Sequence, residues 1–366
     1  MKVIPVIFLV FFMCGCTELY DFMVENDKPS LVIESQISNV SFSESKDYPS
    51  DGRYFTVRLR YTSNVAAVRD VGVESAEVNL IDDQGNNWYY TPSYSTPGLY
   101  TLFDDNFHAE KGVKYKLKVT LQNEEKYESS WEEMPEDYSA PIGNISFNET
   151  SVQKYVYQAG ERVYKNIKGI DVVINLPKNN LDHPLYYIWK FKPTWTYRSP
   201  LNSIFDENYE CWITSDYYLS DYAFQKDFVG SYKKSLFFVE TEHNDRIFGE
   251  FTTLVTQYSV SEEYYSFWRD LVEQGERGGL FDPPPFNLKT NFVSSDPEKQ
   301  VYGYFGVAEE QARRWWFSTW DLSYLVKNRW KDDCTQMRLV QPPKCNNCLL
   351  YMGGVSTNVK PSWWIN

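Results

Sequence analysis

Hydrophobic and polar residues alternate along much of the first third of the chain. The alternation is strict over residues 55–61, and residues 113–121 place five apolar side chains at every second position. A period of two indicates strands with one buried face. Residues 76–81 and 88–90 flank a short run of Asp, Asn, Gln and Gly, which is typical of a turn and predicts a β-hairpin.

Short strands separated by turn residues predict an antiparallel sandwich over residues 30–137 that resembles an immunoglobulin-like module. A polar stretch around Pro135, with Pro141 just beyond, marks its end. Residues 138–366 form a larger β-rich domain. Its strands are expected over residues 169–176, 185–197, 211–214, 236–241 and 248–258. The predicted fold class is therefore mainly β.

One amphipathic helix is expected to interrupt the strands of the larger domain. Ser261 is an N-cap residue, and Glu262 and Glu263 place negative charge in the first turn. Gly275 is expected to end the helix. Its apolar face is formed by four residues at helical spacing: Tyr264, Trp268, Leu271 and Val272.

The first residues follow a different pattern. An apolar run that ends at Met13 is too short to span a bilayer and is typical of a secretory signal. Gly15, a small residue directly before Cys16, fits cleavage and lipidation at Cys16. We therefore expect residues 1–15 to be a lipoprotein signal peptide and residues 16–29 to be a lipidated tether. An ordinary signal peptide with an incidental cysteine is the alternative.

The residues behind Cys16 are acidic, with Glu18 and Asp21 close to the predicted lipid. This stretch resembles the export signal of Bacteroidota lipoproteins that reach the outside of the outer membrane. We expect the acyl chains to anchor the protein in the outer membrane, with its body facing the cell exterior. An anchor that faces the periplasm is the alternative.

Composition narrows the classes of partner. A formal net charge of -14 leaves no basic surface for nucleic acid, so no nucleic-acid partner is expected. Aromatic residues make up 17% of the chain, with 29 Tyr and 12 Trp. Such residues suit half-buried strands, which is the interpretation we favour. The alternative is a binding face of aromatic rings for a glycan or peptide ligand.

The sequence contains no recognisable catalytic motif. A nucleophile elbow, a zinc-protease helix, a phosphate loop and a nucleotide fingerprint are all missing, and His108, His183 and His243 stand outside any motif. The acidic turn at residues 82–87 lacks the ligand spacing of a calcium loop. We expect a protein without a catalytic site, cofactor or metal. A secreted hydrolase with an unrecognised site is the alternative.

Four cysteines follow the predicted lipidation site. They are Cys211, Cys334, Cys345 and Cys348. An even number in an oxidising compartment predicts disulfides, and three pairings are possible. The two closing cysteines also have the spacing of a redox or zinc motif, but a second such pair is missing. We favour structural disulfides and leave the pairing open.

A proline-rich segment follows the predicted helix. Proline fixes φ, so the segment is expected to hold an extended arm at a low entropic cost. Such an arm would present two phenylalanines to a partner. The alternative, which we favour, is a loop that covers the protein's own sheet. The candidate contact residues are Phe281, Asp282, Pro283, Pro284, Pro285 and Phe286.

Several segments together resemble the Bacteroidota lipoproteins grouped as domain-of-unknown-function family 4249. The resemblance covers nearly all of the mature chain, although Thr290 and Asn291 stand where a Gly-Asn pair is expected. It implies an outer-membrane lipoprotein, often encoded beside a TonB-dependent transporter, and implies no catalytic residue. The segments are residues 31–34, 261–268, 279–285, 301–305, 345–348 and 360–364.

These observations predict a surface lipoprotein that acts as a non-catalytic ligand-binding or accessory subunit of a TonB-dependent nutrient transporter. The lipidation pattern, the aromatic strands and the missing catalytic motifs motivate this prediction. A structural or adhesive cell-surface lipoprotein is the alternative.

Overall fold

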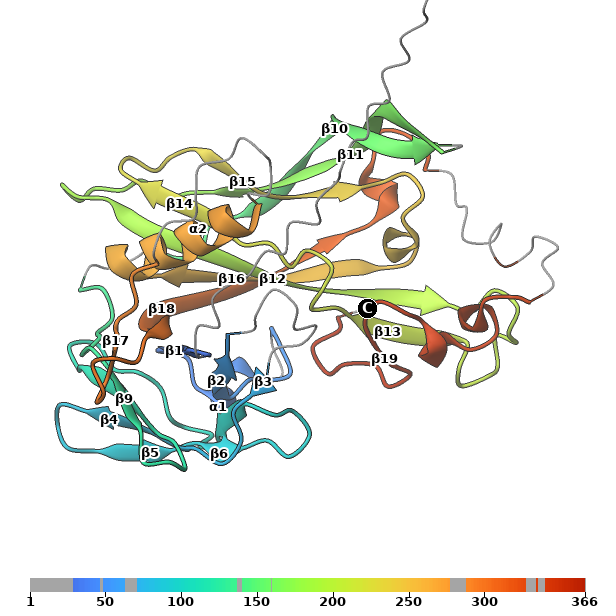
Figure 1. Ribbon diagram of the computed structural model, residues 1–366. Coiled ribbons are helices and arrows are strands. Elements are labelled where there is room, and N and C mark those ends of the chain that lie inside the picture. The colour runs from blue at the N-terminus through green and yellow to red at the C-terminus, as the bar shows by residue number, and fades with distance from the viewer. Residues whose placement is uncertain are drawn as a thin grey trace, which may run out of the picture.

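The computed structural model of the protein describes residues 29–46, 49–62, 71–136, 140–158, 160–276, 288–326, 334 and 340–365. The predicted lipidation site Cys16 and the proline arm at residues 281–286 lie outside the described residues, so their roles stay predictions. Strands dominate the described chain, and the strands form several sheets with mostly antiparallel pairing (Figure 1). The prediction of a mainly β protein is confirmed.

The elements that can be described are strands (β), α-helices (α) and 3-10 helices (η). In chain order they are β1 (Leu31–Ser38), α1 (Phe42–Ser45), β2 (Phe55–Tyr61), β3 (Val71–Gly72), β4 (Glu77–Asp82), β5 (Asn87–Tyr89), β6 (Thr91–Pro92), β7 (Leu99–Leu102), β8 (Tyr115–Thr120), β9 (Lys126–Ser129), β10 (Ile145–Gln158), β11 (Glu161–Asn175), β12 (Leu185–Arg198), β13 (Glu210–Thr214), β14 (Ala223–Asp227), β15 (Lys233–Glu240), η1 (Asp245–Ile247), β16 (Phe251–Ser259), α2 (Glu262–Glu276), β17 (Phe292–Ser294), β18 (Val301–Phe317), η2 (Thr319–Asp321), η3 (Pro343–Cys345), η4 (Cys348–Leu350) and β19 (Val355–Thr357).

The largest sheet, here called the long sheet, runs through both halves of the chain. Its strand order is β19-β13-β12-β16-β18-β1-β2-β7-β6, with β14 beside β12 and β3 beside β2. A second sheet has the order β10-β11-β15, and a third has the order β17-β9-β8-β4-β5. The predicted hairpin is confirmed, since β4 and β5 pair around a turn in which Gly85 has a φ of +94°.

Strand β18 joins the two halves because it changes partner along its length. Residues 301–308 pair in parallel with β1, and residues 309–317 pair antiparallel with β16. Gly303, with a φ of +102°, permits the close approach to β1, since a Cβ there would lie 1.9 Å from the carbonyl oxygen of Ile33. We call the place where β18 changes partner the seam.

Two apolar cores lie between sheets. The first fills the space between the third sheet and strands β1, β2, β7 and β18, and the second lies between β10-β11-β15 and strands β12, β13, β16 and β18. Late residues such as Phe292 and Phe305 belong to the first core, together with residues of the predicted first domain. The packing therefore joins the two predicted domains, and the proposed boundary at residue 137 stays a prediction.

The predicted amphipathic helix is confirmed as α2, which packs on the long sheet (Figure 1). Ser261 Oγ accepts a hydrogen bond from the Tyr264 backbone N–H, as an N-cap residue does. The predicted end at Gly275 is wrong, because the helix continues to Glu276 and Gly275 does not adopt the positive φ of a helix-ending glycine. Across the described ranges, no helix is long and apolar enough to cross a membrane.

Side-chain alternation decides which residues face α2. Along β12, Trp189 points into the second core, whereas Ile188 packs in a third apolar cluster beneath α2. Along β18, Phe305 faces the first core and Tyr304 faces α2.

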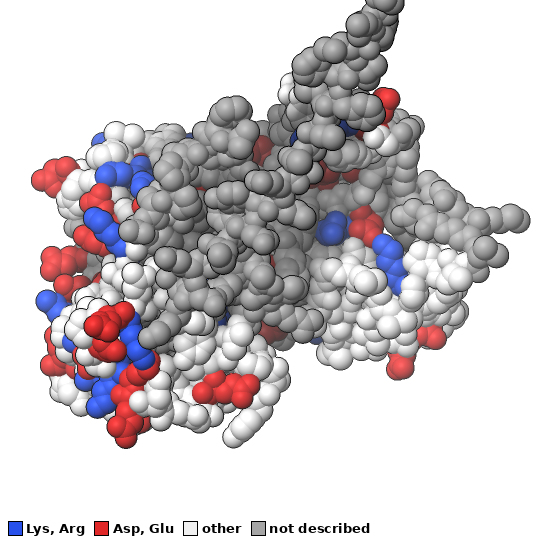
Figure 2. Space-filling model, in the orientation of Figure 1, with Lys and Arg blue, Asp and Glu red and all other residues white. Residues whose placement is uncertain are grey.

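On the molecular face in Figure 2, acidic and basic side chains lie intermixed over the strands of the first core.

Candidate functional site

A cavity of about 340 Å³ lies at the seam, bordered by β1, β2, β12, β16, β18 and α2. Its position follows from the change of partner in β18. Strand β1 ends at Ser38, opposite Ala308, while β18 continues beside β16. The partner of β18 therefore changes from β1 to β16 at this point. Helix α2 borders the cavity on one side.

The alternation in β1 supplies the polar wall of the cavity. Ile33 and Ile37 are fully buried in the first core, so Glu34, Gln36 and Ser38 project from the opposite face of the strand. These three residues line the cavity. A strand buried in apolar cores on both faces would carry apolar residues at these three positions. The polar face of β1 therefore indicates a role other than filling a core.

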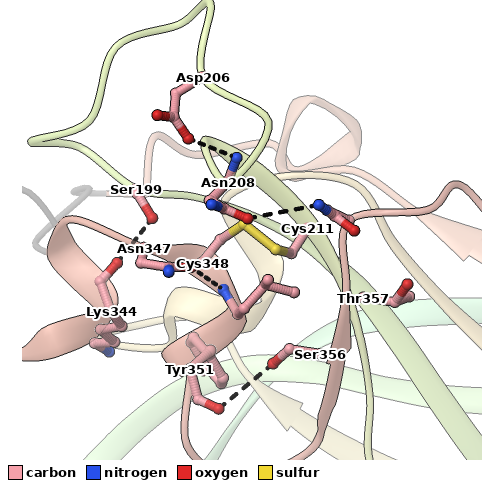
Figure 3. Close-up of a disulfide and its surroundings, with 12 residues drawn as sticks. Ser199, Asp206, Asn208, Cys211, Lys344, Asn347, Cys348, Tyr351, Ser356 and Thr357 are labelled. Atoms are coloured by element: carbon pink, nitrogen blue, oxygen red, sulfur yellow. Dashed lines mark hydrogen bonds between the residues drawn. A yellow bond between two sulfur atoms is a disulfide. The ribbon is translucent and has the colours of Figure 1, made fainter.

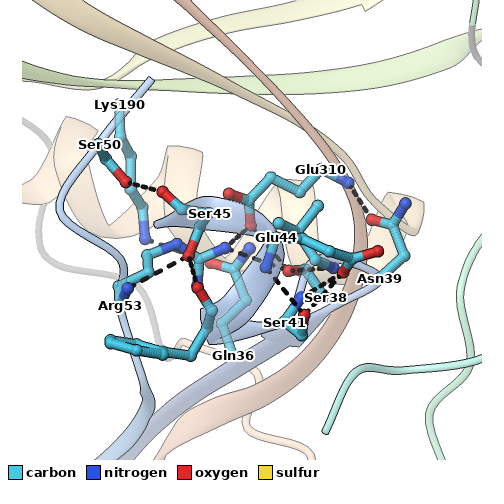
Figure 4. A network of polar contacts seen from close by, with 12 residues as sticks. Gln36, Ser38, Asn39, Ser41, Glu44, Ser45, Ser50, Arg53, Lys190 and Glu310 are labelled. Atoms are coloured by element: carbon cyan, nitrogen blue, oxygen red, sulfur yellow. Dashed lines mark hydrogen bonds and ion pairs between the residues drawn. The ribbon is translucent and has the colours of Figure 1, made fainter. Parts of the chain in front are cut away.

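An ion pair between Arg53 and Glu310 crosses the seam (Figure 4). The Glu310 side chain is 4% exposed, and its carboxylate also accepts a hydrogen bond of 2.7 Å from Ser38 Oγ. The backbone N–H of Glu310 donates to Asn39 Oδ1. The pair thus fixes β18 against the segment that connects β1 to β2.

Lys190 of β12 lies beside this pair and also lines the cavity (Figure 4). Its ammonium is 5.2 to 5.9 Å from the ring centroids of Tyr258, Tyr222 and Trp268, which is a cation–π distance. Lys190 Nζ donates a 3.2 Å hydrogen bond to Gln36 Oε1. Within the described residues, no carboxylate forms an ion pair with Lys190.

Burial shifts the pKa values of the side chains in this wall. It lowers the pKa of Lys190 to about 8, with the neighbouring Arg53 charge acting in the same direction. Burial also raises the pKa of Tyr222 and Tyr264, so both phenols stay neutral at physiological pH. The cavity therefore combines one weakly held proton on Lys190 with neutral aromatic hydroxyls.

A second cavity of about 320 Å³ lies on the other side of the same residues. Arg53, Lys190, Tyr258 and Glu310 line both cavities. This second space is bordered by α1, whose N-terminus is closed by a capping box between Ser41 and Glu44. The same charged residues border both cavities, so a change at Lys190 or Glu310 affects both.

The acidic side chains of the first cavity already have partners. The acidic residues that line the first cavity are held in ion pairs, Glu310 with Arg53 and Glu34 with Arg60 at 2.6 Å. Among the described residues, no group of three or more His, Cys, Asp or Glu side chains is placed to hold a metal ion. What the cavity offers to a small molecule is aromatic surface and hydrogen-bond donors.

The predicted disulfides are present, and the structure decides their pairing. Cys211 is bonded to Cys348, and Cys334 is bonded to Cys345. The two cysteines with redox-motif spacing therefore belong to different disulfides. Figure 3 shows the bond between Cys211 and Cys348, beside which the Cys348 N–H donates to the Asn208 carbonyl at 3.0 Å. Cys211 lies in β13, Cys345 in η3 and Cys348 in η4. None of the four cysteines lines the seam cavity.

Sequence reasoning missed the cavity residues Gln36, Arg53, Lys190 and Glu310. One local signal was present, because Lys190 stands in the middle of a strongly aromatic strand where an apolar or surface residue is expected. The other three come from distant segments, and their meeting depends on the pairing of β1 with β18.

Comparison with protein families identifies the chain. The family described as Domain of unknown function (DUF4249) matches residues 17–314. Comparisons with curated proteins and with solved structures find no match. The family match includes β1, β12, α2 and nearly all of β18, and thus the strands that form the seam. Because it covers well over half of the 366 residues, the chain belongs to the DUF4249 family.

Proposed function

We propose that the protein is a non-catalytic ligand-binding or accessory subunit of a TonB-dependent nutrient transporter, lipid-anchored in the outer membrane with its body at the cell exterior. The seam cavity is its ligand site. The observation that carries this proposal is the Lys190 ammonium, placed on the cavity wall although burial disfavours its charge. Groups that cost stability are common at functional sites.

The amino-terminal pattern supports the anchored part of the proposal. Gly15 and Cys16 have the residue types that lipoprotein processing requires, and several acyl chains hold a protein at a membrane far better than one. The transporter part is supported by the family resemblance stated above. The proline arm at residues 281–286 is a candidate contact with the transporter.

Affinity purification tests this function. The tagged full chain is extracted from its native membranes in a mild detergent, and a transporter barrel is expected to copurify in a comparable amount. Cys16→Ser is the matched control, since it removes only the lipidated thiol and should leave the protein outside the membrane fraction. Repeated purification of the lipidated chain without any barrel would contradict the accessory role.

One surface favours the alternative of an adhesive protein. The outer half of the β10–β11 hairpin exposes Tyr155, Tyr157 and Tyr164 by 61%, 81% and 54%. Arg162 lies over the Tyr155 ring at 4.8 Å. Exposed tyrosine and arginine are frequent in protein interfaces. If this face is adhesive, replacing the tyrosines by serine will reduce attachment of cells and leave nutrient uptake unchanged.

A further inference from the structure

The carboxylates of the seam cavity are already occupied. Glu310 accepts from Arg53 and from Ser38, and Glu34 is paired with Arg60. An ion-paired carboxylate has little capacity left to attract a cation from a ligand. The charges of Glu34 and Glu310 are thus offset by their arginine partners. The remaining polar groups therefore decide which ligand the cavity can bind.

Among the remaining polar residues, Gln36, Lys190 and Arg58 carry N–H donors. Gln36 Oε1 accepts from Lys190 Nζ at 3.2 Å and from the Tyr264 hydroxyl at 3.1 Å. An ammonium cannot accept a hydrogen bond, so this contact fixes the orientation of the Gln36 amide. The buried Gln36 Nε2 is then left without a hydrogen-bond partner. Because this nitrogen is buried and does not face the open cavity, Gln36 acts on a ligand only by holding Lys190 in place.

Two cations add to this donor set. Lys190 has three N–H donors and uses one of them on Gln36. Arg58, at the exposed side of the cavity, forms no ion pair with any carboxylate among the described residues. The aromatic walls supply flat apolar surface but no negative charge. A ligand that satisfies this set carries an anionic acceptor group and a compact body.

We propose that the seam cavity binds a small molecule through a carboxylate group, which is received by Lys190, held in place by Gln36, and by Arg58. This inference rests on the proposed function of the cavity as a ligand site. The volume of about 340 Å³ lies at the lower end of small-molecule sites, so the cavity holds one sugar ring or a dipeptide and not a polymer. Uronic acids and the carboxyl ends of short peptides are the two sources of this chemistry.

Isothermal titration calorimetry on the full chain in a nonionic detergent at pH 7 distinguishes the two sources. The sugar arm compares glucuronate with methyl glucoside, and the peptide arm compares N-acetyl-dialanine with its carboxamide. In one arm the acid is expected to bind roughly tenfold or more tightly than its neutral counterpart, since hydrogen bonds to a charged group are among the stronger ones. The arm that shows this difference names the source.

Lys190→Met keeps the length of the side chain and removes its charge. It is expected to abolish the preference for the acid, which is a loss of roughly tenfold in affinity. Lys168→Met is the matched control, because Lys168 also lies over a tyrosine ring, at 5.1 Å from Tyr324, but does not line the cavity. Circular dichroism spectra check that each variant is folded. Gln36→Leu provides a second, smaller reduction in affinity.

Three results would overturn the carboxylate proposal. They are equal binding of acids and neutral counterparts, an unchanged preference in Lys190→Met, and no binding of any of the four probes. Binding of a neutral probe alone would leave the ligand-binding function standing. Whether a transporter barrel copurifies with the protein does not depend on any of these three results. A failure of the carboxylate proposal can therefore be told apart from a failure of the accessory role.

Discussion

The disulfide-bonded end of the long sheet and the seam in its middle treat polar and reactive side chains in opposite ways. At the β13 and β19 end, Cys211 and Cys348 have no exposed surface, and their disulfide joins β13 to η4 (Figure 3). At the seam, Lys190 keeps a charge that its surroundings disfavour, and Gln36 keeps an amide donor without a partner. The disulfide end holds the chain together, while the seam retains groups that reduce stability.

The seam is the part of this fold where a function is to be sought, because it retains side chains that reduce stability. A core filled only for stability would replace Lys190 by an apolar residue, because its neighbours Tyr258, Tyr222 and Trp268 already form an aromatic surface. The disulfides at the β13 and β19 end of the sheet offset such a loss. If this account is correct, changes at the disulfides will reduce stability most, and removal of the seam charge will increase it.

The largest effect is expected at the long-range disulfide. Cys211→Ser combined with Cys348→Ser opens a link across 137 residues, and loss of the entropic constraint on the unfolded chain should lower the free energy of unfolding by about 5 kcal/mol. Cys334→Ser combined with Cys345→Ser opens a link across 11 residues and should cost about 3 kcal/mol. Guanidinium unfolding curves measure both. Equal losses, or a larger loss for the short link, would contradict this order.

The second effect concerns the ion pair at the seam. Glu310→Gln removes a buried carboxylate and leaves Arg53 without its partner, so the free energy of unfolding should fall by about 2 kcal/mol. Glu128→Gln is the matched control, since Glu128 pairs with Lys116 and Lys118 at the surface and should change stability by about 0.5 kcal/mol or less. Thermal denaturation at pH 7 compares the two. A control effect as large as that of Glu310→Gln would show that burial of the seam pair does not matter.

Local patterns predicted much of the fold. The apolar segment at residues 185–197 corresponds closely to β12, and the Ser261 cap places the start of α2 correctly. Alternation along residues 113–121 predicted β8 with its buried face. These elements are determined by nearby residues, because the periods of strands and helices are readable in a short window. The mainly β class follows from them.

The candidate site and the disulfide pairing were not predictable in the same way. Gln36 and Glu310 meet only because β18 pairs first with β1 and then with β16, and no local pattern determines such a pairing. The four cysteines allowed three pairings, and only the folded positions of Cys211 and Cys348 select one. Contacts between distant segments depend on the whole topology, which a short sequence window does not contain.

The smallest effect, and the one of opposite sign, is expected at Lys190. Lys190→Met removes a charge that burial disfavours and keeps the stem that packs against the aromatic rings, so the free energy of unfolding at pH 7 should rise by about 1 kcal/mol. Thermal and guanidinium unfolding measure the change. Lys168→Met again serves as the control and should be neutral or slightly destabilising, because it removes the contact of Lys168 with the Tyr324 ring and lies outside the seam cavity.

The pH dependence of this gain tests its cause. Lys190 has a pKa of about 8 in the folded protein and an ordinary value of 10.5, so between these values the unfolded chain binds more protons than the folded chain. The charge penalty in the wild type is therefore complete below about pH 8 and disappears as the pH rises towards 10.5. The advantage of Lys190→Met should shrink over the same interval. Arg53, Glu34 and Glu310 line the same cavity as position 190 and are unchanged in the variant. A gain that persists unchanged to pH 10 would therefore mean that packing, and not the lysine charge, distinguishes the seam from the disulfide end.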